Sequence, residues 1–130
     1  MQIVEAVFQY QFVHNGSALQ TNAAAYYLEM YSADGKQTDP PDEIMKHFEG
    51  HTPPVRKWSE AREKKHMDES GKNLKTMGFF IGVIKRNGRD EAEVSGGYSE
   101  SLLSGGGGIY YLKRKEGKWV VEKDVQRWVK

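Results

Sequence analysis

The sequence contains no cysteine among its 130 residues. This absence excludes disulfide bonds, thiolate nucleophiles and zinc sites built on cysteine. An excess of one charge is also lacking, because 19 Lys and Arg residues stand against 18 Asp and Glu, which gives a formal charge of +1. Without a strong net field, a nucleic acid or an anionic lipid surface would need a local basic patch.

Long hydrophobic runs are absent as well. No apolar stretch approaches the roughly 18 residues of a membrane span, and the N-terminus lacks the basic and apolar regions of a secretory signal. We therefore expect a cytoplasmic protein with no membrane partner. The length is typical of one domain, and the 38% hydrophobic and 12% aromatic content is enough to build a core. We expect a single domain over residues 1–130.

The N-terminal third predicts a helix followed by a strand. Apolar residues in 2–14 fit both a strand and a helix face, and we favour the helix because His14-Asn15-Gly16 suits a helix C-terminus. Residues 23–31 alternate as a strand does.

A second, short helix is expected after residues 39–43. There Asp39 is placed as the N-cap carboxylate, and two prolines follow it in the first turn. Ile44 and Phe48 would be its buried side, and Gly50 its end. For residues 55–73 we expect an edge strand running into an exposed loop, with a polar helix as the alternative.

From residue 77 onwards the pattern predicts a four-stranded antiparallel meander, with strands over 77–86, 91–103, 109–115 and 119–129. Asn87-Gly88 indicates a type I′ turn, residues 105–108 a flexible glycine-rich hairpin tip, and Gly96-Gly97 a bend in the sheet. Phe80 and Ile84 make a second face of the first strand apolar, which predicts cover on both sides. In the last strand one face is expected to carry the apolar side chains and the other Glu122, Asp124 and Gln126. The apolar residues are Trp119, Val121, Val125 and Val129.

Motifs for metal, phosphate or covalent chemistry are weak. The glycines at 105–108 run into a strand, whereas a phosphate loop runs into a helix. Glu43, His47 and His51 recur at four-residue spacing, but Gly50 ends the helix before His51, so we expect surface and capping roles and no metal. His14 either overlooks a cavity mouth or pairs with the helix dipole. We expect no cofactor, and no catalytic residues are assigned.

Basic residues cluster at 56–65 and 113–115, near Trp58 and Tyr110-Tyr111, which are suitable rings for stacking on single-stranded nucleic acid. Acidic residues are interleaved with the first cluster. We favour solvated edge-strand charge over a nucleic-acid partner.

The expected elements follow the order helix, strand, short helix after Asp39-Pro40-Pro41, and bent meander. The meander ends in Gly117-Lys118-Trp119-Val120-Val121 and Trp128. This order and this ending resemble the nuclear-transport-factor-2-like (cystatin-like) superfamily. The resemblance covers most of the chain. It implies an α+β fold with helices packed on the concave face of a curved antiparallel β-sheet, a cavity between them, and a homodimer formed through the sheet. The catalytic patterns of ketosteroid isomerases and limonene epoxide hydrolases do not match this sequence.

Within that fold, an aromatic lining of the cavity is expected from residues that also suit a hydrophobic core. We predict a small, partly apolar ligand there, and a ligand-free interaction module or homodimer as the alternative. The candidate ligand-binding residues are Tyr10, His14, Tyr26, Trp58, Tyr98 and Trp128.

Overall fold

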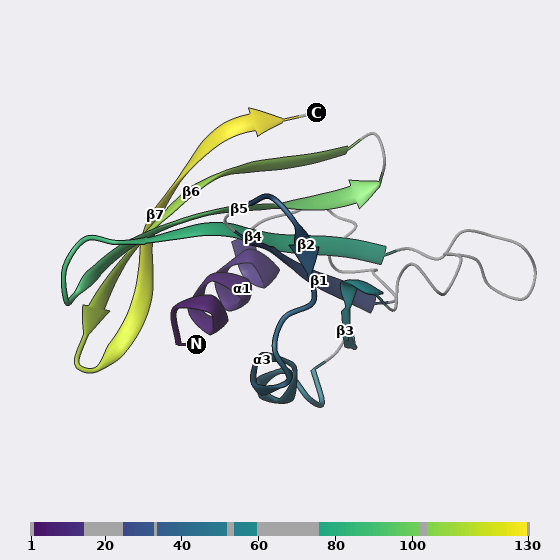
Figure 1. The fold of residues 1–130 in the computed structure, drawn as a ribbon, viewed down its shortest axis with the longest axis horizontal. Helices are drawn as coiled ribbons and strands as arrows, with labels where there is room; N and C mark the ends of the chain where they lie inside the picture. Colours follow the sequence, from purple (N-terminus) through teal and green to yellow (C-terminus); the bar gives the residue numbers. More distant parts are fainter. Residues whose placement is uncertain are drawn as a thin grey trace, which may run out of the picture.

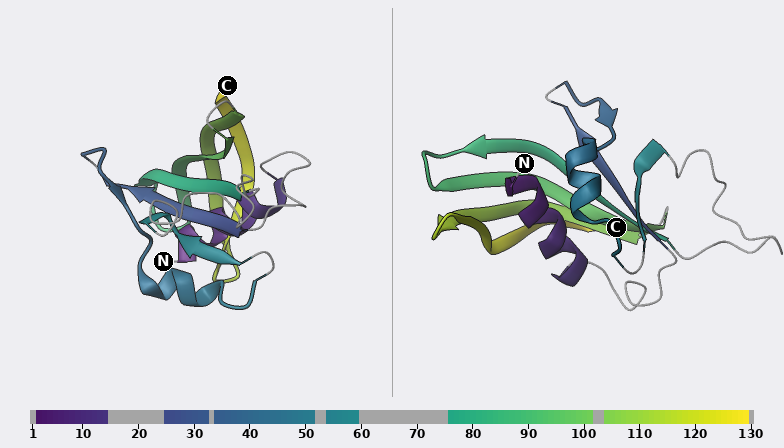
Figure 2. Two further views of the ribbon diagram at one scale, coloured as in Figure 1. Left: turned by 90° about the vertical axis from the view of Figure 1, so that its right-hand side faces the viewer. Right: turned by 90° about the horizontal axis from the view of Figure 1, so that it is seen from below.

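The computed structural model describes residues 2–14, 25–32, 34–51, 54–59, 76–101 and 104–129. They form a mixed seven-stranded sheet, with strands in the order β2-β1-β4-β5-β6-β7 and β3 beside β1. Helices α1 and α3 lie on the same side of this sheet, as the views in Figures 1 and 2 agree. We call that side the helix-bearing face and the other side the open face. The elements are α1 (Gln2–His14), β1 (Ala25–Tyr31), β2 (Gln37–Thr38), α3 (Asp42–His47), β3 (Val55–Lys57), β4 (Thr76–Arg86), β5 (Glu91–Ser101), β6 (Ser104–Lys115) and β7 (Lys118–Val129).

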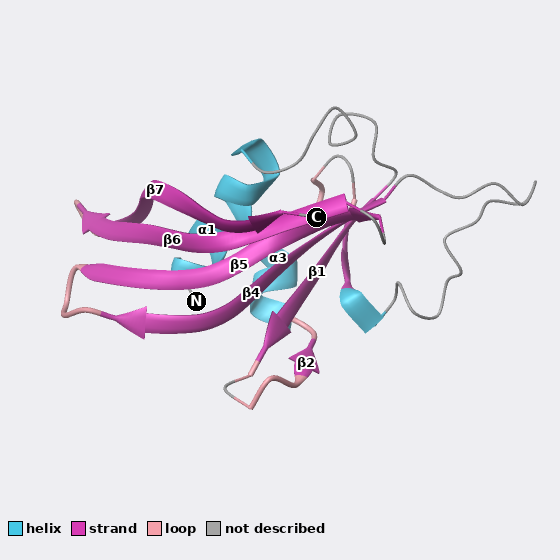
Figure 3. Cartoon of the chain, turned by 90° about the horizontal axis from the view of Figure 1, so that it is seen from above, coloured by secondary structure: helices cyan, strands magenta, loops and turns pink. Residues whose placement is uncertain are grey.

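The predicted helix over residues 2–14 and the predicted meander are both confirmed. Strands β4 to β7 pair in sequence order, each antiparallel to the next, and Figure 3 shows them side by side. The expectation of a purely antiparallel sheet is wrong, because β1 is parallel to both β3 and β4. Parallel neighbours need a long crossover connection, and the chain between β1 and β4 provides it.

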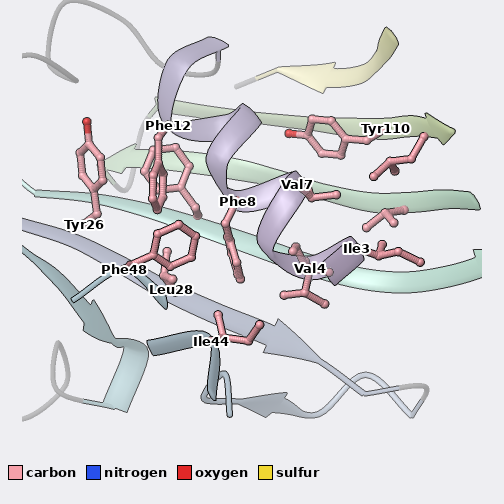
Figure 4. Close-up of a cluster of buried hydrophobic side chains, with 14 of the residues drawn as sticks. Ile3, Val4, Val7, Phe8, Phe12, Tyr26, Leu28, Ile44, Phe48 and Tyr110 are labelled. Atoms are coloured by element: carbon pink, nitrogen blue, oxygen red, sulfur yellow. The ribbon is translucent and has the colours of Figure 1, made fainter. Parts of the chain in front are cut away.

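The hydrophobic core fills the space between the two helices and the helix-bearing face (Figure 4). Phe8 and Val7 of α1 are fully buried, and Phe12 packs on Phe48 and Phe79 with ring centroids 5.1 Å apart in each pair. Burial of this apolar area is the main force that holds α1 on the sheet. Among the described residues, no helix is long and apolar enough to span a membrane.

Helix α3 begins differently from the prediction. Ile44 and Phe48 are buried as expected, but Pro41 is the N-cap and no side chain caps the helix. Asp39 instead accepts hydrogen bonds from the backbone N–H and the hydroxyl of Ser59, at 2.9 and 2.6 Å. Asp39 therefore connects the residues that precede α3 to the segment after β3.

Two turn predictions in the meander are wrong. The glycines at 105–108 are not a hairpin tip, because they lie within β6 and pair with β5. A type I′ turn requires positive φ at both central residues, and Asn87 does not have it. The Asn87 N–H instead donates a hydrogen bond to the Glu91 carbonyl across a longer loop. Positive φ at both central positions occurs at Glu116 (51°) and Gly117 (79°), in the two-residue turn between β6 and β7.

Register shifts also change which side chains share a face. Between Ile81 and Ile84 the pairing of β4 with β5 shifts, and Ser95 Oγ accepts the Val83 N–H at 2.7 Å. Ile84 consequently pairs with the buried Val94, and Val83 is 62% exposed. The predicted face alternation is therefore wrong beyond Ile81. Phe80 alternates with the buried Phe79 and Ile81 and packs on Trp128, so it remains on the open face. No helix of the described residues covers that face (Figures 1 and 3).

Candidate functional site

A hollow of about 240 Å³ lies between the last turn of α1 and strands β6 and β7. Its floor consists of Gly107, Gly108, Ile109 and Val125, and its polar and aromatic walls are His14, Tyr98, Tyr110, Asp124 and Gln126. Pockets that hold drug-sized ligands are typically about 300–1,000 Å³, so this hollow suits a smaller molecule.

The glycines at the floor of the hollow lie where β7 approaches β6 closely. A Cβ on Gly108 would lie 2.0 Å from the Val125 carbonyl oxygen, and one on Gly107 would lie 2.8 Å from the Trp128 ring. Neither position has room for a side chain. The two glycines thus let β7 approach β6 closely at the base of the hollow.

A bulge places Asp124 on the helix-bearing face. The pairing of β6 with β7 shifts between Tyr111 and Leu112, and Glu122 is the extra residue on β7. Asp124 therefore pairs with Tyr110, whose side chain points toward α1 (Figure 4). The prediction that Asp124 and Gln126 face away from the residues that pack on the core is wrong for this reason.

Tyr10 connects α1 to this carboxylate. Its hydroxyl donates a hydrogen bond of 2.5 Å to Asp124 Oδ2. Burial, followed by that hydrogen bond and the charge of Asp124, raises the pKa of Tyr10 to about 12. Tyr10 stays protonated at neutral pH and keeps Asp124 in place.

His14 stacks on Tyr10 with ring centroids 4.0 Å apart and planes 14° from parallel. Its Nδ1 lies 3.2 Å from the backbone carbonyl of Tyr10. A carbonyl only accepts, so Nδ1 carries the proton of this hydrogen bond and Nε2 of the neutral ring is an acceptor. The last turn of α1 thus places the His14 ring at the wall of the hollow, with the Tyr10 ring stacked against it.

Tyr110 forms the deeper wall. Its hydroxyl accepts a hydrogen bond of 3.2 Å from Gln11 Nε2. The pKa of Tyr110 is raised, mainly by burial and further by the negative charge of Asp124. The same carboxylate therefore disfavours a second negative charge on either tyrosine.

The structure brings together three of the six candidate ligand-binding residues. His14 and Tyr98 line the hollow, and Tyr10 touches two of its walls. Tyr26 lies in the core, 4% exposed and packed on Phe12 and Phe79. Trp58 is half-buried beyond β3.

Trp128 lies on the open face, away from the hollow's walls. The second register shift of β7, between Gly107 and Gly108, makes Arg127 the extra residue and pairs Trp128 with Gly107. Its ring lies 6.3 Å from that of Phe80. The alternation of residues in the sequence reveals neither this register shift nor the earlier one. The sequence therefore did not predict Asp124, Gln126 and Tyr110 as wall residues.

The histidines at four-residue spacing do not converge with Glu43. His47 contacts Glu5 at 3.6 Å and Gln9 at 2.9 Å on α1, whereas the His51 ring packs on Phe12. No group of three or more potential metal ligands occurs in the part of the chain that the structure describes.

The second basic cluster is matched by acids. Lys113 and Lys115 contact Glu122 at 3.6 and 2.8 Å, and Arg114 contacts Asp90 at 3.0 Å. This pairing supports the interpretation as solvated surface charge, and the absence of a nucleic-acid partner stays a prediction. Most of the first cluster lies outside the described residues.

No family model and no curated protein matches this chain. Among solved structures, it is similar to an NTF2-like protein of unknown function from Shewanella baltica OS155, with 15% sequence identity and a TM-score of 0.45. The match covers 99% of this chain and 91% of that one.

Proposed function

We propose that this domain binds a small, partly apolar ligand in the hollow between α1, β6 and β7, on the concave side of the sheet. The observation that carries the proposal is the joint placement of Tyr98, Tyr110 and His14 around a floor that contains two glycines, with Asp124 at the same wall. Aromatic walls with a few convergent polar groups are typical of small-molecule sites. The single domain over residues 1–130 and the cytoplasmic location stay predictions.

Amide chemical-shift mapping by NMR tests this function. The probes are three one-ring compounds that differ in charge: benzylammonium, benzyl alcohol and benzoate. We expect at least one of them to shift the amides of Gly107, Gly108 and Gln126 saturably. No saturable shift with any probe at millimolar concentration, or shifts confined to the open face, would contradict the proposal.

A pair of matched variants locates the binding. Gln126→Trp puts a bulky ring at the wall of the hollow and should weaken binding of the best probe about tenfold or more. Gln37→Trp makes the same exchange at an exposed position of β2, away from the hollow, and should leave the affinity unchanged. Equal effects of the two exchanges would place the binding elsewhere.

A homodimer through the open face is the second candidate function. Trp128 is 44% and Val120 42% exposed, and Phe80 is half-buried on the same face, with its ring beside that of Trp128. Lys85, Glu93 and Lys123 lie on neighbouring strands of that face, so a second copy related by a two-fold axis would meet both signs of charge. Sedimentation velocity distinguishes the dimer from a monomer.

A further inference from the structure

The charge of the hollow is negative. Of the nine residues that line it, Asp124 alone carries a full charge when His14 is neutral. Basic residues next to it along β7 are directed elsewhere: Lys123 lies over the Tyr111 ring at 4.9 Å on the open face, and Arg127 is the exposed extra residue of a bulge. Among the described residues, no cation pairs with Asp124.

The carboxylate of Asp124 is the charged hydrogen-bond acceptor of this wall. Tyr10 gives its proton to Asp124 Oδ2, and the Nδ1 proton of His14 goes to the Tyr10 carbonyl. These two donors are therefore used within the protein. Tyr98 and Gln126 also line the hollow and carry donor groups, but neither is charged. A cationic ligand that donates a hydrogen bond therefore complements the carboxylate.

Aromatic faces surround the carboxylate. Tyr98, Tyr110 and His14 line the hollow, and Tyr10 packs edge-on against Tyr110 with ring centroids 5.8 Å apart. The electron-rich face of a tyrosine attracts cations. Tyrosine rings beside one unneutralised carboxylate are an arrangement that suits organic cations.

We propose that the hollow selects a small organic cation, a protonated amine or quaternary ammonium group on a single apolar ring, with Asp124 as its counter-ion. The inference rests on the proposed function and names the ligand class for the same site. A carboxylate or phosphate ligand is disfavoured, because Asp124 would repel it and no lining residue with a fixed positive charge would pair with it. The raised pKa values of Tyr10 and Tyr110 are consistent with this negative field.

The three one-ring probes test this class directly, because they have similar size and carry charges of +1, 0 and −1. In titrations at low salt we expect benzylammonium to bind about tenfold or more tightly than benzyl alcohol, and benzoate to bind most weakly. Raising NaCl from about 20 mM to about 500 mM should weaken benzylammonium binding and leave benzyl alcohol unaffected.

Variants identify the counter-ion. Asp124→Asn should reduce the preference for benzylammonium over benzyl alcohol to about twofold or less. Glu122→Gln is the matched control, because it removes the same charge from the same strand at a carboxylate that pairs with Lys113 and Lys115. It should keep the preference. Tyr10→Phe retains the ring but frees Asp124 from its donor, so benzylammonium affinity should be equal to wild type or higher.

The outcomes distinguish the preference for a cation from the proposal that the hollow binds a ligand. Benzyl alcohol or benzoate binding as tightly as benzylammonium overturns the cation inference and leaves ligand binding in place. An unchanged preference in Asp124→Asn also overturns it. No binding by any probe overturns both. If Asp124→Asn fails to fold by circular dichroism, the salt dependence of the wild type and the Tyr10→Phe result still decide the question.

Discussion

Gln11 fixes how α1 sits on the sheet. Its side chain is fully buried, and Nε2 lies 3.1 Å from both the Phe80 and Gly97 carbonyl oxygens as well as 3.2 Å from the Tyr110 hydroxyl. Gly96 permits this approach, because a Cβ there would lie 3.3 Å from Gln11 Nε2 and 2.5 Å from the Phe80 oxygen. One amide therefore joins the helix to β4, β5 and β6 behind the hollow.

We expect Gln11→Leu to lower the free energy of unfolding by about 1–3 kcal/mol, because buried carbonyl groups lose their donor. Urea denaturation measures the change. Gln9→Leu on the exposed side of the same helix is the control and should change stability by about 0.5 kcal/mol or less. Equal stability of the two variants would show that the buried amide is not important for stability.

Glu29 is a half-buried carboxyl on β1. Burial raises its pKa above the ordinary value of 4.5, although hydrogen bonds from Tyr31 and from Gln37, at 3.4 and 3.0 Å, oppose the shift. The folded state therefore holds this proton more tightly than the unfolded chain. Its contribution to stability is fully present below pH 4.5 and is lost as the pH rises through the folded pKa.

Replacing Glu29 by Gln should remove this pH dependence. The wild type is expected to lose stability relative to Glu29→Gln between about pH 4 and about pH 7, as measured by urea denaturation at each pH. Gln37→Ala takes away one opposing hydrogen bond and should make the loss larger. A gain of wild-type stability over the same range would mean that the hydrogen bonds outweigh burial.

At the scale of elements, two extra residues in β7 decide where its side chains point. Glu122 and Arg127 each interrupt the pairing with β6, so Asp124 joins the helix-bearing face and Trp128 the open face. Without these bulges the alternation would put Asp124 with the outward-facing residues. The candidate site thus depends on the irregular positions of the strand.

The glycines of β5 and β6 permit the close approach that these irregular strands require. A Cβ on Gly97 would lie 2.1 Å from the Gly106 carbonyl oxygen, whereas a Cβ on Gly78 of β4 would meet nothing closer than 3.9 Å. Gly97→Ala should therefore destabilise the protein by about 1–3 kcal/mol. Gly78→Ala should be neutral or stabilise by about 0.4–1 kcal/mol, because it restricts the unfolded chain. Thermal and urea unfolding compare the two, and equal destabilisation would contradict the steric argument.

The whole molecule presents two different faces of one sheet. The helix-bearing face holds the core and the hollow, and the open face carries Trp128 and Phe80 together with charges of both signs. An exposed apolar patch with a polar surround is typical of an interaction surface. The first face is therefore the proposed ligand side and the second the proposed dimer side.

The dimer proposal predicts a sedimenting mass of about twice that of the 14.8 kDa chain. A dimer of this kind is stable when the interface buries about 800 Å² per partner. Trp128→Glu should shift the protein to monomer. Val13→Glu, at a 72% exposed apolar position of α1, is the control and should leave the dimer intact. A monomeric wild type at high protein concentration would contradict the proposal.

The sequence by itself determined the local structure of this protein. Residues 2–14 form the predicted helix, Ile44 and Phe48 are buried, and four consecutive strands form the C-terminal meander. These features follow from hydrophobic periodicity and turn residues close together in the chain. Of the six residues predicted to bind a ligand, Tyr10, His14 and Tyr98 lie at or next to the hollow, and their role in binding stays a prediction.

Only the tertiary structure decided the register of the sheet. The bulges at Val83, Glu122 and Arg127 arise from pairing with a neighbouring strand, and the glycines at 105–108 became part of β6 because β5 and β7 pair with them. A shift of one residue moves every later side chain to the other face. This is the reason why Asp124 lies at the hollow and Trp128 lies on the open face.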